Sequence, residues 1–302
     1  MSAASSSAPQ PTRKNPASAK KLWRRLARWL LAAAALICLV FLLAVLNNNY
    51  SLSHSSRAQF EARRDQSLNR ALDWIAGNTY ELEDNPTLML MVFEMSQISH
   101  DPRLEGVLRQ YQQLQFGEPK SMLDRVLLWL LDPARPLPTV RVADMHGNFV
   151  DYLWVSHAVA PDRVLLTPAD EANLLSPTRW SWGKRQKQLL ALGFYRYFNP
   201  AAAGTPEMNA TLNHVAEGVA RDGSYDFRLT DSYMQRNAIL LAAHRPDLVR
   251  RRWVERIIDR QNADGSWDYC WYGWCRGLAE FGFKHNPGHS TVQAAWALTM
   301  LK

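Results

Sequence analysis

The N-terminal part of the chain lacks acidic side chains, and this absence explains the charge of the protein. The first 28 residues contain no Asp or Glu but seven Lys and Arg, which equal the whole formal net charge of +7. Removing those seven leaves 28 basic residues against 28 acidic ones, so the rest of the chain is balanced. We therefore expect residues 1–28 to form a disordered basic tail, and we expect no nucleic-acid binding by the folded part.

Residues 29–46 lack charge, Pro and Gly altogether. As a helix, these 18 residues span roughly 27 Å, close to the thickness of a bilayer core. A cleaved signal peptide is the alternative, but no cleavage pattern of small residues follows the run; three Asn and a Tyr do, at residues 47–50. The segment therefore predicts an uncleaved transmembrane anchor.

No later segment approaches 18 uninterrupted apolar residues, which predicts a single pass. The cationic flank precedes the anchor, so the positive-inside rule keeps the tail in the cytoplasm and sends residues 47–302 across the membrane. We expect the inner (cytoplasmic) membrane of a bacterium, with a periplasmic C-terminal domain. A eukaryotic secretory membrane is the alternative.

Cysteine is scarce, with three residues in the chain. Cys38 lies inside the anchor, which leaves Cys270 and Cys275 in the exported domain. An oxidising compartment favours a disulfide between these two, with free thiols or a zinc site as the alternatives.

The exported part has apolar residues at helical spacing almost throughout. Residues 51–76, 87–99, 102–115, 119–131 and 177–198 each predict a helix. Asn85 is the expected N-cap of the helix at 87–99, which is apolar on all sides, as an inner helix should be. Residues 132–176 contain five Pro and are expected to be irregular, with a short strand near 139–142. The fold class expected for residues 47–302 is all-α.

Two segments near the C-terminus, 212–243 and 250–302, follow one pattern of helix, turn, linker and helix. The turn sequence is Asp-Gly-Ser-aromatic, starting at Asp222 in the first copy and at Asp264, 42 residues later, in the second. The second helices match at an offset of 58 residues, so the second copy holds an insertion of 16 residues. Helical hairpins of this length have to stack, because one hairpin cannot bury its own apolar face.

The second copy carries a motif, Gln-x-x-Asp-Gly-Ser-Trp at residues 261–267, followed by a helix that reads Ser-Thr-Val-Gln-Ala-Ala-Trp-Ala-Leu at residues 290–298. This combination resembles the repeat of the terpenoid cyclase and protein prenyltransferase α/α toroids, over about residues 206–302. The resemblance implies alternating outer and inner helices around a central cavity, complete or partial. It also implies that Gln261 and Trp267 tie the end of an outer helix to its neighbour. Such barrels host several chemistries and non-catalytic modules, so the motif indicates architecture rather than function.

Two reaction types of that superfamily are excluded by missing motifs. The chain has neither the Asp-x-Asp-Asp run of the proton-donating cyclases nor the Cys-Gly-Glu-Gln of thioester domains. By position in the repeat, Asp231 resembles the zinc-binding Asp of the prenyltransferases and His289 resembles their His, but Tyr233 stands where their Cys should be. Two ligands fall short of the three or four that zinc takes, so we expect no cofactor; His285 or Cys270 would have to complete a zinc site.

The resemblance places Asp231, His289, Tyr233 and His285 at the mouth of the cavity, as the candidate catalytic residues. A histidine there is suited to act as a general base. The alternative for Asp231 is a cap of the following helix, together with Thr230, and the alternative for His289 is a locally hydrogen-bonded polar residue.

The insertion holds an aromatic loop, in which four of the seven residues 269–275 are Tyr or Trp. Trp271, Tyr272 and Trp274 offer ring faces on which a sugar or an apolar chain can stack, and Arg276 offers a polar contact. Core packing beneath a loop fixed by the two Cys is the alternative.

Two classes of function follow from these features. The first is a membrane-anchored, non-catalytic binding or assembly module that uses the aromatic loop and the central cavity. The second is an enzyme that processes a glycan, lipid-linked or peptide substrate in the cavity. The first is favoured because neither the metal ligands nor an acid run is complete. The expected partners are the membrane and a glycan, lipid or peptide ligand, or a protein partner in the periplasm.

Overall fold

The computed structural model describes residues 16–50, 55–114, 121–141, 150–176, 182–268 and 287–301. The chain forms two compact units, Met1–Asn47 and Asn48–Lys302. The first unit consists of helix α1, Pro16–Tyr50, whose last turn belongs to the second unit. Among the described residues, α1 alone is long and apolar enough to cross a membrane, over Trp23–Tyr50. An apolar N-terminal helix is therefore present, as an anchor or a signal segment requires.

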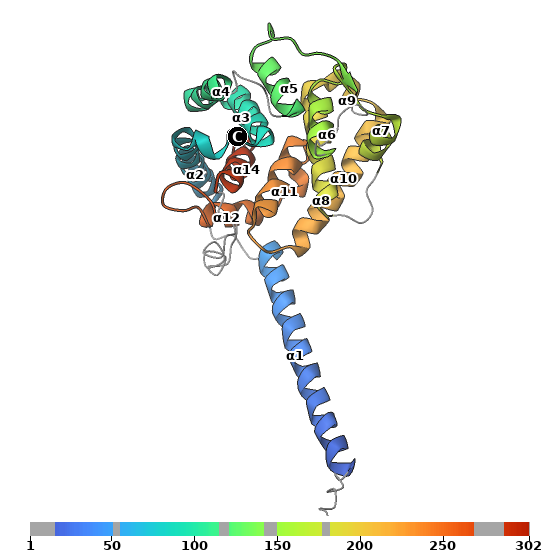
Figure 1. Cartoon of the computed structure of the whole chain (residues 1–302). Coiled ribbons are helices and arrows are strands. Elements are labelled where there is room, and N and C mark those ends of the chain that lie inside the picture. Colours follow the sequence, from blue (N-terminus) through green and yellow to red (C-terminus); the bar gives the residue numbers. More distant parts are fainter. Residues whose placement is uncertain are drawn as a thin grey trace, which may run out of the picture. The chain divides into compact units, whose positions relative to one another are not determined.

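The second unit is helical, which confirms the all-α fold class (Figure 1). Its helices are α2 (Arg57–Gly77), α3 (Pro86–Ser99), α4 (Pro102–Leu114), α5 (Met122–Leu131), α6 (Val150–Val159), α7 (Pro168–Leu175), α8 (Trp182–Phe198), α9 (Pro200–Ala203), α10 (Pro206–Tyr225), α11 (Asp231–Ala242), α12 (Arg251–Asp259) and α14 (Pro287–Thr299). Short 3-10 turns lie at Thr79–Glu81 and Pro246–Leu248.

The region expected to be irregular is more ordered than its prolines indicate. It contains α6 and α7, and two short strands, β1 (Val140–Arg141) and β2 (Val164–Leu165), which pair in parallel. The strand expected near 139–142 is present as β1. Its partner β2 was not anticipated, because a strand of two residues leaves no periodic pattern in the sequence.

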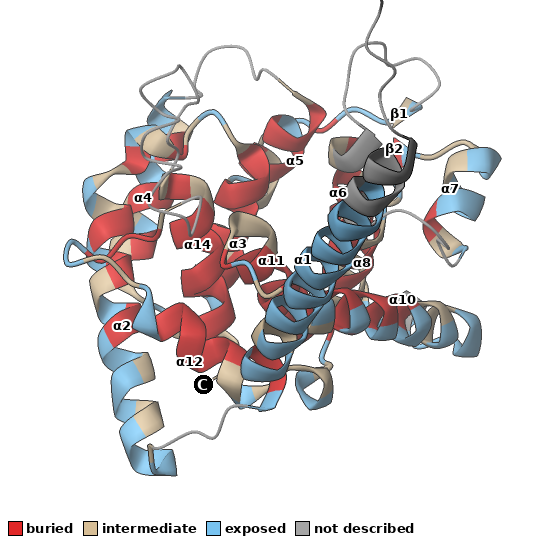
Figure 2. Cartoon of the chain, turned by 90° about the horizontal axis from the view of Figure 1, so that it is seen from below, coloured by how far each residue is buried: buried red, intermediate tan, exposed pale blue. Residues whose placement is uncertain are grey.

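The core is built on helices that are buried on nearly all sides. In α14 every residue from 290 to 299 is buried, and α14 packs against α2, α3 and α11 (Figure 2). In α11 every residue from 233 to 242 is buried. The helices α2 and α10, by contrast, each expose one face, which fits their amphipathic sequences.

Helix α3 shows how local sequence determines one of these core elements. Asn85 caps the helix, because its side-chain oxygen accepts hydrogen bonds from the backbone N–H groups of Thr87 (3.2 Å) and Leu88 (3.3 Å). Pro86 occupies the first turn, where its missing N–H costs nothing. The predicted start of this helix is confirmed.

The turn after α12 ties that helix to α2. The side chain of Gln261 accepts a hydrogen bond from the Ser67 hydroxyl (2.9 Å) and donates to the Ser67 carbonyl (2.8 Å). Trp267 is fully buried and donates from Nε1 to the Ile257 carbonyl at 2.7 Å. Gly265 has φ +95°, and a Cβ there would lie 2.4 Å from the Arg70 carbonyl oxygen, so only glycine fits. Gln261 and Trp267 thus have the structural role expected of them.

The turn predicted at Asp222 is wrong. Helix α10 continues through Gly223 to Tyr225, whereas the matching residues after α12 form a true turn. The physical reason is tertiary: the carboxylate of Asp222 accepts a hydrogen bond from Arg185 of α8 at 2.8 Å, and Gly223 is buried against Trp253. The two copies therefore share their pair of helices but not the conformation of the turn.

Candidate functional site

Asp231 and His289, 58 positions apart in the sequence, lie side by side in the second unit. Asp231 is the first residue of α11, and His289 lies in the first turn of α14, which packs against α11. The Oδ2 of Asp231 is 3.3 Å from the Nδ1 of His289, and the two side chains are 18% and 25% exposed. The pair is thus partly open to solvent at the start of two otherwise buried helices.

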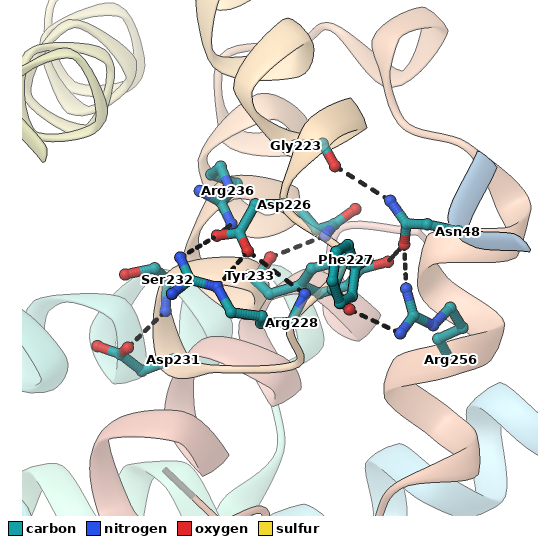
Figure 3. A network of polar contacts seen from close by, with 11 residues as sticks. Asn48, Gly223, Asp226, Phe227, Arg228, Asp231, Ser232, Tyr233, Arg236 and Arg256 are labelled. Carbon is teal, nitrogen blue, oxygen red and sulfur yellow. Dashed lines mark hydrogen bonds and ion pairs between the residues drawn. The ribbon is translucent and has the colours of Figure 1, made fainter. Parts of the chain in front are cut away.

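Asp231 also makes a local contact at the start of α11, although Thr230 and not Asp231 is the N-cap residue. Its Oδ1 accepts a hydrogen bond from the backbone N–H of Ser232 at 2.6 Å, while Thr230 makes no side-chain cap (Figure 3). The carboxylate therefore stabilises the start of α11 with one oxygen and faces His289 with the other. The two roles coexist and both hold Asp231 in place.

Two neighbours of the His289 Nδ1, the carboxylate of Asp231 and the amide nitrogen of Gln293, favour opposite tautomers of the ring. A carboxylate only accepts hydrogen bonds, so its contact with Nδ1 requires a proton on that nitrogen. The neutral ring then presents Nε2 as an acceptor, which is the form in which histidine binds a proton, a hydroxyl or a metal. The amide nitrogen of Gln293, one helical turn later, also lies 3.3 Å from this Nδ1. Because an amide nitrogen only donates, this contact favours the other tautomer of the ring, with its proton on Nε2. His289 lies inside α14 rather than before it, because the helix begins at Pro287.

Two polar groups on α14 are buried next to this pair without satisfying their hydrogen bonds. Within the part of the chain that the structure describes, the Oγ of Ser290 and the Oε1 of Gln293 have no hydrogen-bond partner, although both residues are 0% exposed. Leaving such a group unsatisfied costs about 1–3 kcal/mol. Such groups call for an explanation, and a water or a ligand that completes them is one; both belong to the first two turns of α14, as His289 does.

The described residues on either side of residues 269–286, which contain the aromatic loop, lie at or join α14. The first end of this aromatic segment is held by the backbone N–H of Trp267, which donates to the Oγ1 of Thr291 in α14 at 3.0 Å. Its other end joins α14 directly at Pro287. The remaining site residues of the sequence prediction lie outside the described residues: Cys270, Trp271, Tyr272, Trp274, Cys275, Arg276 and His285. Covalent connection alone therefore brings both ends of this segment to the first turns of α14.

Tyr233 is separated from the Asp231–His289 pair. Its hydroxyl donates to the Oδ1 of Asn48 at 3.0 Å, and the guanidinium of Arg256 lies 5.5 Å from the centre of its ring (Figure 3). Tyr233 is 1% exposed, and burial raises the pKa of its hydroxyl. Tyr233 was a predicted catalytic residue, but its hydroxyl is bound to Asn48 instead of facing the Asp231–His289 pair.

A buried acid on α3 was missed from the sequence. Glu94 is 2% exposed, and its Oε2 accepts a hydrogen bond from the Nε1 of Trp296 in α14 at 3.0 Å. Burial raises the pKa of Glu94 to about 8. The ring of Trp296 stacks on Phe194 of α8, with 5.7 Å between the ring centres. The available signal was one charged residue in an otherwise apolar helix.

The described residues provide few of the ligands that a metal needs. No group of three or more His, Cys, Asp or Glu among them is arranged to hold an ion. Asp231 and His289 supply two ligands at most. Two surface pockets formed by described residues, of about 560 Å³ near Arg135 and about 310 Å³ near Phe60, are not lined by this pair.

Comparison with models of known protein families, with curated proteins and with solved structures finds no match to this chain. The resemblance to the α/α toroids therefore stays a prediction based on motifs. The function has to be argued from the geometry of the pair and of the buried groups beside it.

Proposed function

We propose that this protein is a single-pass membrane protein with a cytoplasmic tail and a periplasmic domain of α/α-toroid type. The apolar part of α1, Trp23–Tyr50, supports the anchor, and the basic flank supports its direction. The order of helix packing supports the toroid. Each of the helices α3, α5, α6, α8, α11 and α14 packs on the next one in this order, and the series closes because α14 packs on α3. Helices α2, α4, α10 and α12 are the candidates for the outer layer.

The domain acts as a binding module for a glycan at the start of α11 and α14. The contact of Asp231 with His289, at the point where both ends of the aromatic segment are held, is the observation that carries this proposal. Carboxylate, imidazole, hydroxyl and amide groups match the hydroxyls of a sugar, and Trp and Tyr rings match its apolar face. A glycan needs both kinds of group, and the sequence supplies the aromatic ones at residues 269–274, between the described ends.

An enzyme acting on a glycan, lipid-linked or peptide substrate is the second candidate, and the same contact favours it. An imidazole oriented by a carboxylate is the usual arrangement of a general base. Binding ranks first because the hydroxyl of Tyr233 is held by Asn48 and because the sequence has neither a complete set of metal ligands nor an acid run.

The test is glycan binding by the full-length chain in lipid nanodiscs. The probe is a β-linked N-acetylglucosamine tetrasaccharide, and the readouts are isothermal titration calorimetry and the melting temperature. We expect Asp231→Asn and His289→Gln each to weaken binding by about tenfold, the effect of about 1.4 kcal/mol from one lost polar contact. The controls are Asp247→Asn and His214→Gln, which change exposed residues of the same types and should leave affinity unchanged.

Each result has a distinct meaning. Weaker binding with an unchanged melting temperature supports the binding module, and release of shorter sugars from the probe supports the enzyme. If both variants bind the probe as tightly as the wild type does, the proposal is contradicted. The same holds if the variants only lower the melting temperature, because Asp231 would then have a structural role alone.

A further inference from the structure

The second unit holds the chain immediately after the apolar run. Leu46 ends that run, and Asn48, two residues later, is 0% exposed. The side chain of Asn48 donates to the Gly223 carbonyl at 3.2 Å and accepts hydrogen bonds from Tyr233 and Arg256 (Figure 3). No linker therefore separates the apolar run from the fold of this unit.

Asn49 extends the same set of contacts. Its side chain donates to the Ser224 carbonyl at 2.7 Å and accepts from the Nε1 of Trp253 at 3.3 Å. Two residues of helix correspond to a rise of about 3 Å, and the headgroup layer on one side of a bilayer is about 5–7 Å deep. If the apolar run spans a membrane, the groups that hold Asn48 and Asn49 lie at headgroup depth. These groups belong to the end of α10 and to α12.

Exposed aromatic and basic side chains lie on or next to these elements. Tyr50 and Tyr225, at the ends of α1 and α10, are 66% and 55% exposed. Arg221 is exposed one turn before Tyr225. The guanidinium of Arg250 lies 5.0 Å from the centre of the Tyr50 ring and donates to the Asn49 carbonyl at 3.3 Å, so it is held beside an exposed ring.

The two acids at the end of α10, Asp222 and Asp226, are buried and paired, whereas Glu217, one turn before Arg221, and Asp259 of α12 are exposed. Asp222 accepts from Arg185 at 2.8 Å. Asp226 is shared between Arg236 (2.6 Å) and Arg228 (2.7 Å), so one carboxylate faces two guanidiniums. The side chain of Arg228 is half exposed. The carboxylates of Asp222 and Asp226 are therefore buried, and neither adds an exposed negative charge to this surface.

We propose that this basic aromatic face, formed by Tyr50, Arg221, Tyr225, Arg228 and Arg250, binds the phosphates of anionic phospholipids in the leaflet where the anchor emerges. Arginine and tyrosine are the side chains suited to that layer, since one pairs with phosphate and the other places a ring at the apolar boundary. The inference rests on the membrane anchor of the proposed function and is independent of the glycan site.

The test compares the full-length chain in two kinds of nanodisc. One contains phosphatidylcholine alone, and the other contains phosphatidylcholine with roughly 30% phosphatidylglycerol, an anionic lipid. Melting is followed by tryptophan fluorescence. Two arginines near an anionic surface should raise the melting temperature by about 4–8 °C in the anionic discs. The Arg221→Gln/Arg250→Gln variant should lose this difference, and Arg109→Gln, an exposed arginine on α4, should keep it. Arg221→Gln alone, which removes no described hydrogen bond, should lose about half and serves if the double variant does not fold.

Further arms separate the sources of phosphate and the two proposals. Equal melting in both disc types, or a full difference retained by Arg221→Gln and by the double variant, would overturn the lipid site. The same rise with glycerol phosphate added to phosphatidylcholine discs would make it a site for free anions instead. Release of the chain from membranes by alkaline carbonate would show that the anchor itself fails, whereas failure of glycan binding would leave the lipid result unaffected.

Discussion

Glu94→Gln should make the protein more stable at neutral pH, although it removes a charged residue. Glu94 is buried in the core, and the Nε1 of Trp296 donates to its Oε2 at 3.0 Å. Burial raises the pKa of Glu94 from 4.5 to about 8, so the folded protein keeps this carboxyl protonated at pH 7. The unfolded chain has no such reason to hold the proton. Glutamine has nearly the same shape and is neutral at every pH.

The sign and size of the effect follow from the two pKa values of Glu94. The contribution of Glu94 to the free energy of unfolding is fully present below pH 4.5, where the carboxyl is protonated in both the folded and the unfolded chain. This contribution is lost as the pH rises through 8. Between these values the free energy of unfolding falls by about 1.4 kcal/mol per pH unit, since the unfolded chain releases a proton that the folded chain keeps. The loss is about 3 kcal/mol at pH 7 and about 5 kcal/mol above pH 8. The glutamine variant does not incur it, so its advantage should grow from near zero at pH 4.5 to about 3 kcal/mol at pH 7.

The assay is urea unfolding of the full-length chain in detergent micelles at pH 4.5, 6, 7 and 8, followed by tryptophan fluorescence. Glu105→Gln, at an exposed position on α4, is the matched control and should show no pH-dependent difference from the wild type. A difference between Glu94→Gln and wild type that is constant with pH, or that grows toward acid, would refute a buried protonated carboxyl.

Three further changes test other parts of the structure. Asn48→Ala removes the acceptor for the buried guanidinium of Arg256 and should lower the free energy of unfolding, measured with urea, by about 2–4 kcal/mol. The control Asn47→Ala changes the exposed neighbouring residue and should alter this free energy by less than about 0.5 kcal/mol. Gly265→Ala should lower the free energy of unfolding by about 2 kcal/mol or more, because the added Cβ meets a carbonyl oxygen of α2 and φ is +95°. An unchanged melting temperature would argue against this turn. Ser290→Ala removes a buried hydroxyl without a described partner and should raise the melting temperature without ligand while weakening glycan binding; a rise with unchanged affinity would separate Ser290 from the site.

Features set by neighbouring residues were predictable from the sequence. The N-cap at Asn85 and the turn at Gly265 depend on one side chain or one backbone angle, so their signals are local. The all-α class follows from apolar spacing repeated over many segments. The resemblance to the toroids placed Asp231 and His289 together at the mouth of a cavity, and the two side chains lie 3.3 Å apart.

Features set by distant residues were not predictable. Helix α10 continues through Gly223 because Arg185 and Trp253, from other helices, make that conformation favourable. The partner of Glu94 lies 202 positions away in α14, and the partners of Asn48 lie 175 to 208 positions away. The three Asn after the apolar run contain no sign of such partners, so the contacts of Asn48 were not anticipated. No local pattern reports a contact at such a separation.

The contact between Asp231 and His289 is the centre of the proposed function, and a double-mutant cycle on glycan affinity tests it most directly. The cycle compares the wild-type protein, Asp231→Asn, His289→Gln and the double variant in nanodiscs, with the tetrasaccharide as probe. Because the carboxylate acts through the imidazole, we expect each single change to cost about tenfold and the double variant to bind no more weakly than the singles. A double variant that binds as well as the wild type, or two losses that simply multiply, would contradict the account.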